Sequence, residues 1–169
     1  MGRRAALRLG LVAALPLLLA ACGLRPLYDG AAGGQLAREL AAIAVETPET
    51  RLGWLLGERL RAELAPRGSA PTRYRLTVAL QSRKQPLAIQ LDDSITRFEL
   101  ALSARYVLRD VRGQEVLHQG VLRRVASFNV VVSPFATLVA EQDAQRRAAA
   151  ELAQAIRTQL ALYFRGREP

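Results

Sequence analysis

The sequence predicts an α+β fold, a two-layer sandwich in which two helices pack on one face of a small mixed or antiparallel sheet of about four strands. Hydrophobic residues recur at helical spacing up to residue 65, alternate with a period of two from residue 74, and return to helical spacing after residue 133. A chain of 169 residues with 50% hydrophobic content buries one core. Two helices on one side of the sheet are the economical packing for this order of elements.

The first 21 residues resemble an export signal. A leader with three arginines precedes the apolar stretch 9–20, which is too short for a permanent membrane-spanning helix. Leu19–Cys22 reads Leu-Ala-Ala-Cys and resembles a bacterial lipobox, in which the cysteine receives lipid. The chain therefore divides into a signal peptide at 1–21, a lipidated tether at 22–36 and a single domain at 37–165, with Cys22 as the expected lipidation site.

The charge of the chain favours an anionic partner. The formal net charge of +9 falls to +6 once Arg3, Arg4 and Arg8 leave with the signal peptide, and guanidinium groups bind phosphate and carboxylate well. A GC-rich genome produces the same arginine bias, and we attribute most of the arginine count to it. Aromatic residues are only 5% of the chain and no basic stripe interleaves with them, so nucleic acid is not an expected partner.

The first half of the domain is expected to begin with a strand at 40–45, after a glycine-rich tether. Thr47 and Pro48 then open a helix that ends near Ala65. Gly53 and Gly57 inside this helix cost about 1 kcal/mol each relative to alanine, which indicates close backbone packing. The apolar face of the helix carries Leu52, Leu55, Leu56, Leu60 and Leu64.

Three strands and a long helix follow. Alternation runs from Tyr74 to Gln81 and resumes after Pro86, as expected for one strand with a bulge or edge kink. The next strand spans 98–109, and a turn at 110–114 leads to a returning strand at 115–128. Ser133 and Pro134 open the last helix, which extends to Phe164; the sequence leaves open whether it is continuous or broken near Ala140.

No arrangement of residues typical of catalysis is present. His118 is the single histidine, and a lone histidine on a strand is usually a packed or surface residue. Asp92 and Asp93 are adjacent in a turn, where they more simply serve the turn itself. Motifs for nucleophilic serines, phosphate loops and zinc are missing. The sequence therefore predicts no enzyme, no metal site and no cofactor.

Binding is the better expectation, and two basic pairs are the candidate site. Arg83 and Lys84 end one strand while Arg123 and Arg124 lie in another, so neighbouring strands would gather them into a patch for an anionic ligand. The alternative is that these charges only keep a strand edge from aggregating, and we weight the two equally. Further arginines that would extend the patch are Arg75, Arg97 and Arg105.

The segment Cys22–Tyr28 resembles the start of the lipopolysaccharide-assembly lipoprotein family LptE, in particular its alphaproteobacterial members. A weaker resemblance lies in Ser133–Leu138 and Glu141–Asp143, the proline-led start of the last helix. The resemblance implies a non-enzymatic, lipid-anchored protein on the periplasmic side of the outer membrane, and Gly23 after the cysteine agrees with that sorting. It also implies two partners: the β-barrel protein LptD, which the domain plugs, and lipopolysaccharide.

Two other functions remain open at this point. One is a free-standing periplasmic-facing lipoprotein that binds another anionic ligand, and the other is a structural envelope lipoprotein without a ligand. Co-purification with a barrel partner would distinguish the LptD-plugging function from both of these alternatives.

Overall fold

The structure is a computed structural model that describes residues 30–167 apart from 66–67, 69, 90–94 and 114. The chain divides into two compact units, Met1–Gly33 and Gly34–Pro169, and the fold presented here is that of the second unit. The expected signal peptide, the lipobox and Cys22 lie outside the described residues. No described helix is both long enough and apolar enough to cross a membrane.

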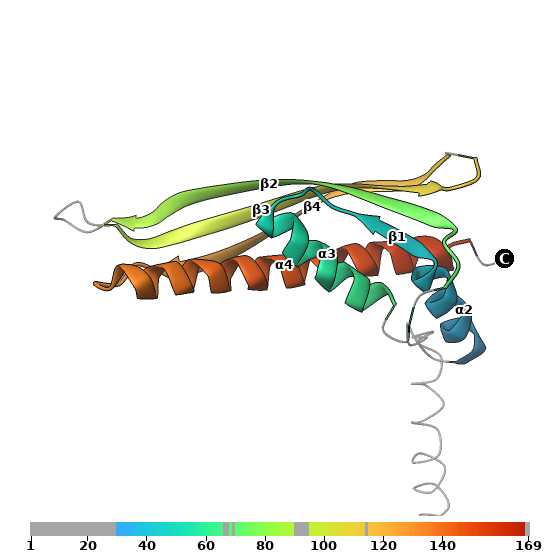
Figure 1. Ribbon diagram of the computed structural model, residues 1–169, viewed down its shortest axis with the longest axis horizontal. Coiled ribbons are helices and arrows are strands. Elements are labelled where there is room, and N and C mark those ends of the chain that lie inside the picture. Colours follow the sequence, from blue (N-terminus) through green and yellow to red (C-terminus); the bar gives the residue numbers. More distant parts are fainter. Residues whose placement is uncertain (1–29, 66–67, 69, 90–94, 114, 168–169) are drawn as a thin grey trace, which may run out of the picture. The chain divides into compact units, whose positions relative to one another are not determined.

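The described helices and strands follow the chain as α2 (Gly30–Ala41), β1 (Ile43–Glu46), α3 (Arg51–Leu64), β2 (Tyr74–Ile89), β3 (Ile95–Asp110), β4 (Val116–Asn129) and α4 (Pro134–Arg165). The strands form one mixed sheet in the order β1-β2-β3-β4, and α3 and α4 lie on one face of it (Figure 1). β1 runs parallel to β2, with α3 as the crossover, and the other two pairs are antiparallel. The predicted α+β class is confirmed.

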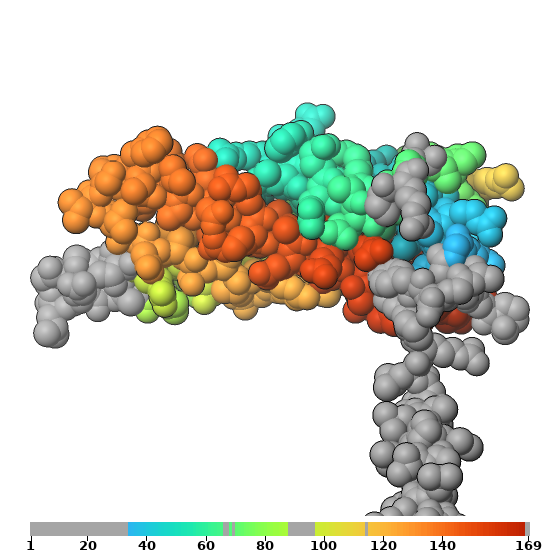
Figure 2. All heavy atoms as spheres, turned by 90° about the horizontal axis from the view of Figure 1, so that it is seen from below, coloured from blue at the N-terminus to red at the C-terminus, as the bar shows by residue number. Residues whose placement is uncertain are grey.

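Alternation along the strands places the core between the sheet and α4. Tyr74, Leu76 and Val78 of β2 are buried on the helical side, and the register sets Leu76 opposite Leu108 and Val78 opposite Tyr106 of β3. Figure 2 shows α4 crossing this side of the domain with α3 beside it. The buried stripe of α4 consists of Ala144, Ala148, Ala149, Leu152, Ala153, Ile156, Leu160, Ala161 and Phe164.

The opposite side of the sheet, which we call the open face, has no described helix over it (Figure 1). A solvated face is usual for an antiparallel sheet, and here it carries many arginines. Its members alternate with the core residues: Arg75, Thr77, Ala79, Gln81, Arg83 and Gln85 from β2, Arg97, Glu99, Ala101, Ser103, Arg105, Val107 and Arg109 from β3, and Gln119, Val121, Arg123, Val125, Ser127 and Asn129 from β4.

The start of α3 differs from the expected one. Thr50, not Thr47, is the N-cap, and its hydroxyl accepts a hydrogen bond from the Gly53 backbone N–H at 3.1 Å. Gly53 and Gly57 are buried together with Leu56, because the helix packs against the chain that leads into it. The expected close backbone packing is confirmed at Gly53, which lies against the Pro48 carbonyl, whereas the atoms nearest to Gly57 belong to the side chains of Thr47 and Arg61.

Helix α4 is continuous from Pro134 to Arg165, so of the two possibilities left open by the sequence the one without a break near Ala140 is correct. Ser133 caps it by accepting from the Ala136 N–H at 3.4 Å, and Pro134 occupies the first turn as expected. The helix has 32 residues and is therefore about 48 Å long. After Ala140 the buried, alanine-rich residues of α4 keep helical spacing up to Phe164, and no proline or glycine occurs among them.

Helix α2 was not among the expected elements. It occupies Gly30–Ala41, where a slack tether and the beginning of a strand were expected, and the strand itself starts later, at Ile43. Leu36 and Leu40 are each only 2% exposed, so this helix is held by burial of its apolar side. The helical spacing of these two leucines outweighs the low helix propensity of the glycines before them.

The two edges of the sheet differ. β2 pairs with β1 only over Tyr74–Thr77, and beyond that its outer edge carries Arg83, Lys84 and Pro86, residues that discourage pairing with other chains. Its register shifts between Pro86 and Ala88, which confirms the expected bulge in one continuous strand. No described strand pairs with the outer edge of β4.

Candidate ligand-binding surface

The structure does not bring the four predicted basic residues onto one surface. Successive side chains of a strand point to opposite faces, so Arg83 and Arg123 lie on the open face while Lys84 and Arg124 point to the helical side. Arg83 and Arg123 come from the two strands that flank β3. They therefore form a pair on the same side of the sheet, two strands apart.

Arg83 and Arg123 line the same open hollow, which has a volume of about 560 Å³. Its floor is made of small side chains of β3, because Ala101 is opposite both Arg83 and Val125, and Ser103 is opposite Arg123. The remaining lining residues are Gln81 and Gln85, whose side chains lie on the open face, and Ser82 between Gln81 and Arg83. Amides, hydroxyls and guanidinium groups around a small-residue floor suit a ligand with phosphate and sugar oxygens.

The hollow retains positive charge. Arg123 forms an ion pair with Glu99 at 3.5 Å, and Gln85 donates to the same carboxylate at 3.3 Å. Arg83 has no carboxylate partner among the described residues, and neither has the exposed Arg105 farther along the same face. An incoming phosphate would therefore meet guanidinium groups that are not fully compensated.

Lys84 and Arg124 have structural contacts on the helical side. Lys84 Nζ lies 3.0 Å from Glu141 Oε2 of α4 and 5.4 Å from the centre of the Phe98 ring, so it ties α4 to the sheet. Arg124 donates to the Arg123 backbone carbonyl at 2.8 Å. These contacts separate Lys84 and Arg124 from the hollow, although their charge is the same.

Two of the three further arginines extend the open face at its ends, and both already have a polar partner. Arg75 pairs with Glu46 at 3.3 Å, and Arg97 donates to the side-chain oxygen of Asn129 at 2.9 Å. The amide oxygen of Asn129 carries no full charge and therefore does not neutralise the Arg97 guanidinium. Positive charge is thus spread along the open face and is not confined to the hollow.

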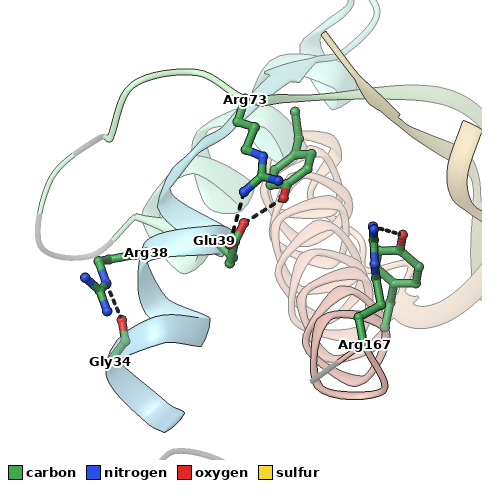
Figure 3. A network of polar contacts seen from close by, with 7 residues as sticks. Gly34, Arg38, Glu39, Arg73 and Arg167 are labelled. Atoms are coloured by element: carbon green, nitrogen blue, oxygen red, sulfur yellow. Dashed lines mark hydrogen bonds and ion pairs between the residues drawn. The ribbon is translucent and has the colours of Figure 1, made fainter. Parts of the chain in front are cut away.

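A second polar cluster joins α2 to the start of β2 (Figure 3). The hydroxyl of the buried Tyr74 donates to Glu39 Oε2 at 2.7 Å, and Arg73 forms an ion pair with Glu39 Oε1 at 3.4 Å. Burial, and then the adjacent Glu39 carboxylate, raise the pKa of Tyr74 to about 12. The cluster borders a hollow of about 180 Å³ that Phe164 and Arg167 also line.

The sequence analysis did not predict the Glu39–Tyr74 cluster, because it expected a flexible tether where α2 forms. The signal that reveals it is the helical spacing of Leu36 and Leu40, which places Glu39 on a helix next to Tyr74. Its side chains hold one another, and the ion pair is partly exposed. We therefore interpret it as a structural lock for α2.

His118 is a packed residue, which is one of the two ordinary roles that the sequence allowed. Its Nε2 lies 3.1 Å from the hydroxyl of the buried Tyr106, and its ring stacks on Tyr163 with 5.1 Å between centroids. Burial raises the pKa of Tyr106. Among the described residues, no group of three or more His, Cys, Asp or Glu side chains is placed to hold a metal ion.

Comparison with known proteins identifies the domain. Residues 39–160 match the family LptE, described as lipopolysaccharide-assembly. That match runs from the end of α2 into the last turns of α4, and it spans more than half of the chain. The chain belongs to the LptE family. This family is one of non-enzymatic lipoproteins, so the LptE domain found here is that of a lipopolysaccharide-assembly lipoprotein.

Relatives of known sequence or structure agree with the LptE assignment. A structure from Caulobacter crescentus, described as a candidate lipoprotein, is 32% identical, covers 80% of this chain and 98% of its own, and superimposes with a TM-score of 0.69. An uncharacterised protein of Rickettsia prowazekii is 28% identical over 147 residues, 87% of this chain and 91% of its own. The rare lipoprotein B of Shewanella oneidensis, 14% identical over 70% of this chain and 91% of its own with a TM-score of 0.53, shares the LptE fold.

Proposed function

We propose that this LptE family member is the lipoprotein subunit of an outer-membrane lipopolysaccharide translocon. In this proposal Cys22 carries the lipid anchor on the periplasmic side, and the domain occupies the lumen of an LptD-type β-barrel, where it assists barrel assembly. The main support is the family match over 39–160, which includes all the strands and most of α4. A rigid domain with an arginine-rich open face suits a polar barrel lumen better than an apolar domain would.

We further propose that lipopolysaccharide binds at the hollow on the open face. The observation that carries this step is that Arg83, which has no carboxylate partner among the described residues, and Arg123, which pairs with Glu99, line one hollow with a net positive charge, while Lys84 and Arg124 are engaged elsewhere. Phosphate groups accept two parallel hydrogen bonds from a guanidinium, so the phosphates of lipid A are the expected contact.

Co-purification tests the barrel partner. The full-length lipoprotein, extracted with a non-ionic detergent from its own membranes, is expected to bring an LptD-type barrel with it in equimolar amount. The Cys22→Ala form should lose membrane attachment without losing the domain fold. A full-length chain that elutes without any barrel would favour the free-standing lipoprotein.

Paired variants test the ligand site. Arg83→Gln with Arg123→Gln is expected to weaken lipopolysaccharide binding by about tenfold, since two charge-assisted contacts are lost. Lys84→Gln with Arg124→Gln is the matched control, because it removes the same charge from the next positions of the same strands. Equal losses in both double variants would show that only net charge matters and that the hollow is not the site.

A further inference from the structure

Two arginines face each other at the end of the open face where β1 pairs with β2 (Figure 1). Arg75 of β2 and Arg109 of β3 are directly opposite in the register, so their side chains lie on the same side of the sheet. Like charges that are directly opposite destabilise a sheet. The fold therefore keeps an unfavourable pair here, and an anion between the two guanidinium groups would offset their repulsion by attracting both.

A single carboxylate serves this pair, and it contacts Arg75 through the inner nitrogen of the guanidinium. Glu46 Oε1 of β1 lies 3.3 Å from Arg75 Nε, while Glu46 Oε2 accepts from the Thr77 hydroxyl at 3.3 Å. Both oxygens of Glu46 are thereby engaged. No described residue accepts a hydrogen bond from Nη1 or Nη2 of Arg75, and such an edge can donate two parallel bonds to a phosphate.

Arg109 is half-buried and has no carboxylate partner among the described residues. The acids of its own hairpin do not neutralise it. Asp110 shares the register of the buried Tyr74 and so points to the helical side, and its carboxylate accepts from the Arg112 backbone N–H at 2.7 Å. Glu115 forms no ion pair with a described residue. The Arg109 guanidinium is thus an unpaired charge that water reaches only in part, which strengthens its attraction for an anion.

The two opposed arginines are separate from the hollow. On β3, Arg109 lies eight residues from Ala101 in the floor of the hollow, which is about 27 Å along the strand. Neither Arg75 nor Arg109 lines the hollow. The exposed Arg105 lies halfway between them on the same face. One phosphate group cannot contact both places, so the pair is a second site and not an extension of the first.

Exposed valines beside these arginines indicate which kind of molecule carries the anion. The register places Val116, which is 45% exposed, opposite Arg109, and Val121, which is 64% exposed, opposite Arg105. The apolar side chains therefore lie on the same face as the cations. A free phosphate would contact only the guanidinium groups, whereas a lipid phosphate would also remove the valines from water through its acyl chain.

We propose that Arg75 and Arg109 form a second phosphate-binding site, which takes the phosphate of a lipid at the end of the open face next to α2. Each guanidinium donates to the phosphate oxygens, and Glu46 positions Arg75 through its Nε. This site does not depend on lipopolysaccharide binding at the hollow. With both sites, one domain holds two phosphate groups at the same time.

The arginine side-chain Nε–H signals in NMR spectra follow each site separately, in the full-length lipoprotein in non-ionic detergent. The probe is glycerol 3-phosphate, which is expected to shift the signals of Arg75 and Arg109 at one common half-saturating concentration. Arg109→Gln should raise that concentration at Arg75 about tenfold, since charge-assisted hydrogen bonds are lost. Arg61→Gln on α3, which removes the same charge from the helical side, is the matched control and should leave it unchanged. Arg83→Gln with Arg123→Gln should also leave it unchanged.

The outcomes separate the second site from the hollow. Shifts at Arg83 without shifts at Arg75 and Arg109 would overturn the second site while the hollow stands, and the reverse result would support the second site and remove the hollow. A tenfold effect of Arg61→Gln as well would show that only net charge matters, which overturns the site.

A second probe tests whether the phosphate belongs to a lipid. Lauroyl lysophosphatidic acid is glycerol 3-phosphate with one acyl chain, and it is expected to half-saturate Arg109 at a concentration at least about tenfold lower. Val116→Ser with Val121→Ser should remove this advantage and leave the titration with glycerol 3-phosphate unchanged. Equal half-saturation by the two probes in the wild type would overturn the lipid as the source and leave free phosphate as the ligand.

Thermal unfolding gives an independent readout. Because Arg75 and Arg109 repel each other when no anion is bound, Arg109→Gln is expected to melt about 1–3 °C above the wild type in phosphate-free buffer. Saturating glycerol 3-phosphate should abolish this difference, since it stabilises the wild type more than the variant. A variant that melts below the wild type without phosphate would show that Arg109 stabilises the fold by itself, which overturns the argument from opposed charges.

Discussion

At the residue scale, Gly53 shows how a single missing side chain positions a helix. A Cβ built on Gly53 would fall on the backbone carbonyl oxygen of Pro48 and within 3.2 Å of the Thr50 hydroxyl, both of which belong to the chain that leads into α3. Neither atom is the free end of a flexible side chain, so the helix could not stay where it is. The glycine therefore has a packing reason that outweighs its low helix propensity.

We expect Gly53→Ala to lower the free energy of unfolding by about 3 kcal/mol, although alanine is the better helix former. Urea denaturation followed by circular dichroism measures this loss. Gly34→Ala in α2 is the matched control: its Cβ would have nothing within 4 Å, so we expect no loss or a gain of up to about 1 kcal/mol. Equal behaviour of the two variants would refute the steric explanation.

The two basic pairs show, also at the residue scale, that adjacent residues of a strand cannot share a surface. Arg83–Lys84 and Arg123–Arg124 were expected to form one patch because they are close in sequence, yet adjacent residues of a strand must point to opposite faces. The alternation around them already contained this information. The pairing of strands across β3 did not follow from the sequence, and it is this pairing that places Arg83 and Arg123 around one hollow.

At the element scale, periodicity predicted the strands and α4 well. The strand alternation is strong because one face of the sheet is buried and the other solvated. The kink at Pro86 was also predictable, since proline is tolerated only at an edge or a bulge. α2 was missed because its glycines resemble a linker and its stability comes from Leu36, Leu40 and the contact with Tyr74, which are tertiary effects.

The attachment of α2 leads to a pH-dependent prediction. Tyr74 has a pKa of about 12 in the folded protein, above its ordinary value of 10.0, so the folded state holds the phenolic proton more tightly than the unfolded state does. The stability that results is fully present below about pH 10 and is lost as the pH rises towards 12. Tyr74→Phe removes both the proton and the hydrogen bond to Glu39.

At pH 8 we expect the free energy of unfolding of Tyr74→Phe to be about 1–2 kcal/mol lower than that of the wild type. The difference should shrink steadily between pH 10 and pH 12, because only the wild type has the phenol to lose. Urea denaturation of both proteins at constant ionic strength measures it. Two curves that remain parallel through this range would contradict the contribution of Tyr74.

At the scale of the whole molecule, the structural lock of α2 and the proposed ligand site lie at different places of the domain. The Glu39–Tyr74 cluster lies near Phe164 at the C-terminal end of α4, and the hollow lies on the open face. The family could be identified because a short motif and the order of the elements agree. The candidate sites could not be identified from the sequence, because they are formed by side chains of different elements that come together only in the folded domain.

The Glu39–Tyr74 contact also determines how the domain would respond to tension. If Cys22 carries the proposed lipid anchor, a pull on it would reach α2 through the backbone, and Glu39 would pass part of it to Tyr74, the first residue of β2, and to Phe164, which packs on Tyr74. β2 and the C-terminal end of α4 would share this force, far from Pro134, where α4 begins. Under the proposed anchoring, the Glu39–Tyr74 contact would therefore bear this force before it reaches the hollow on the open face.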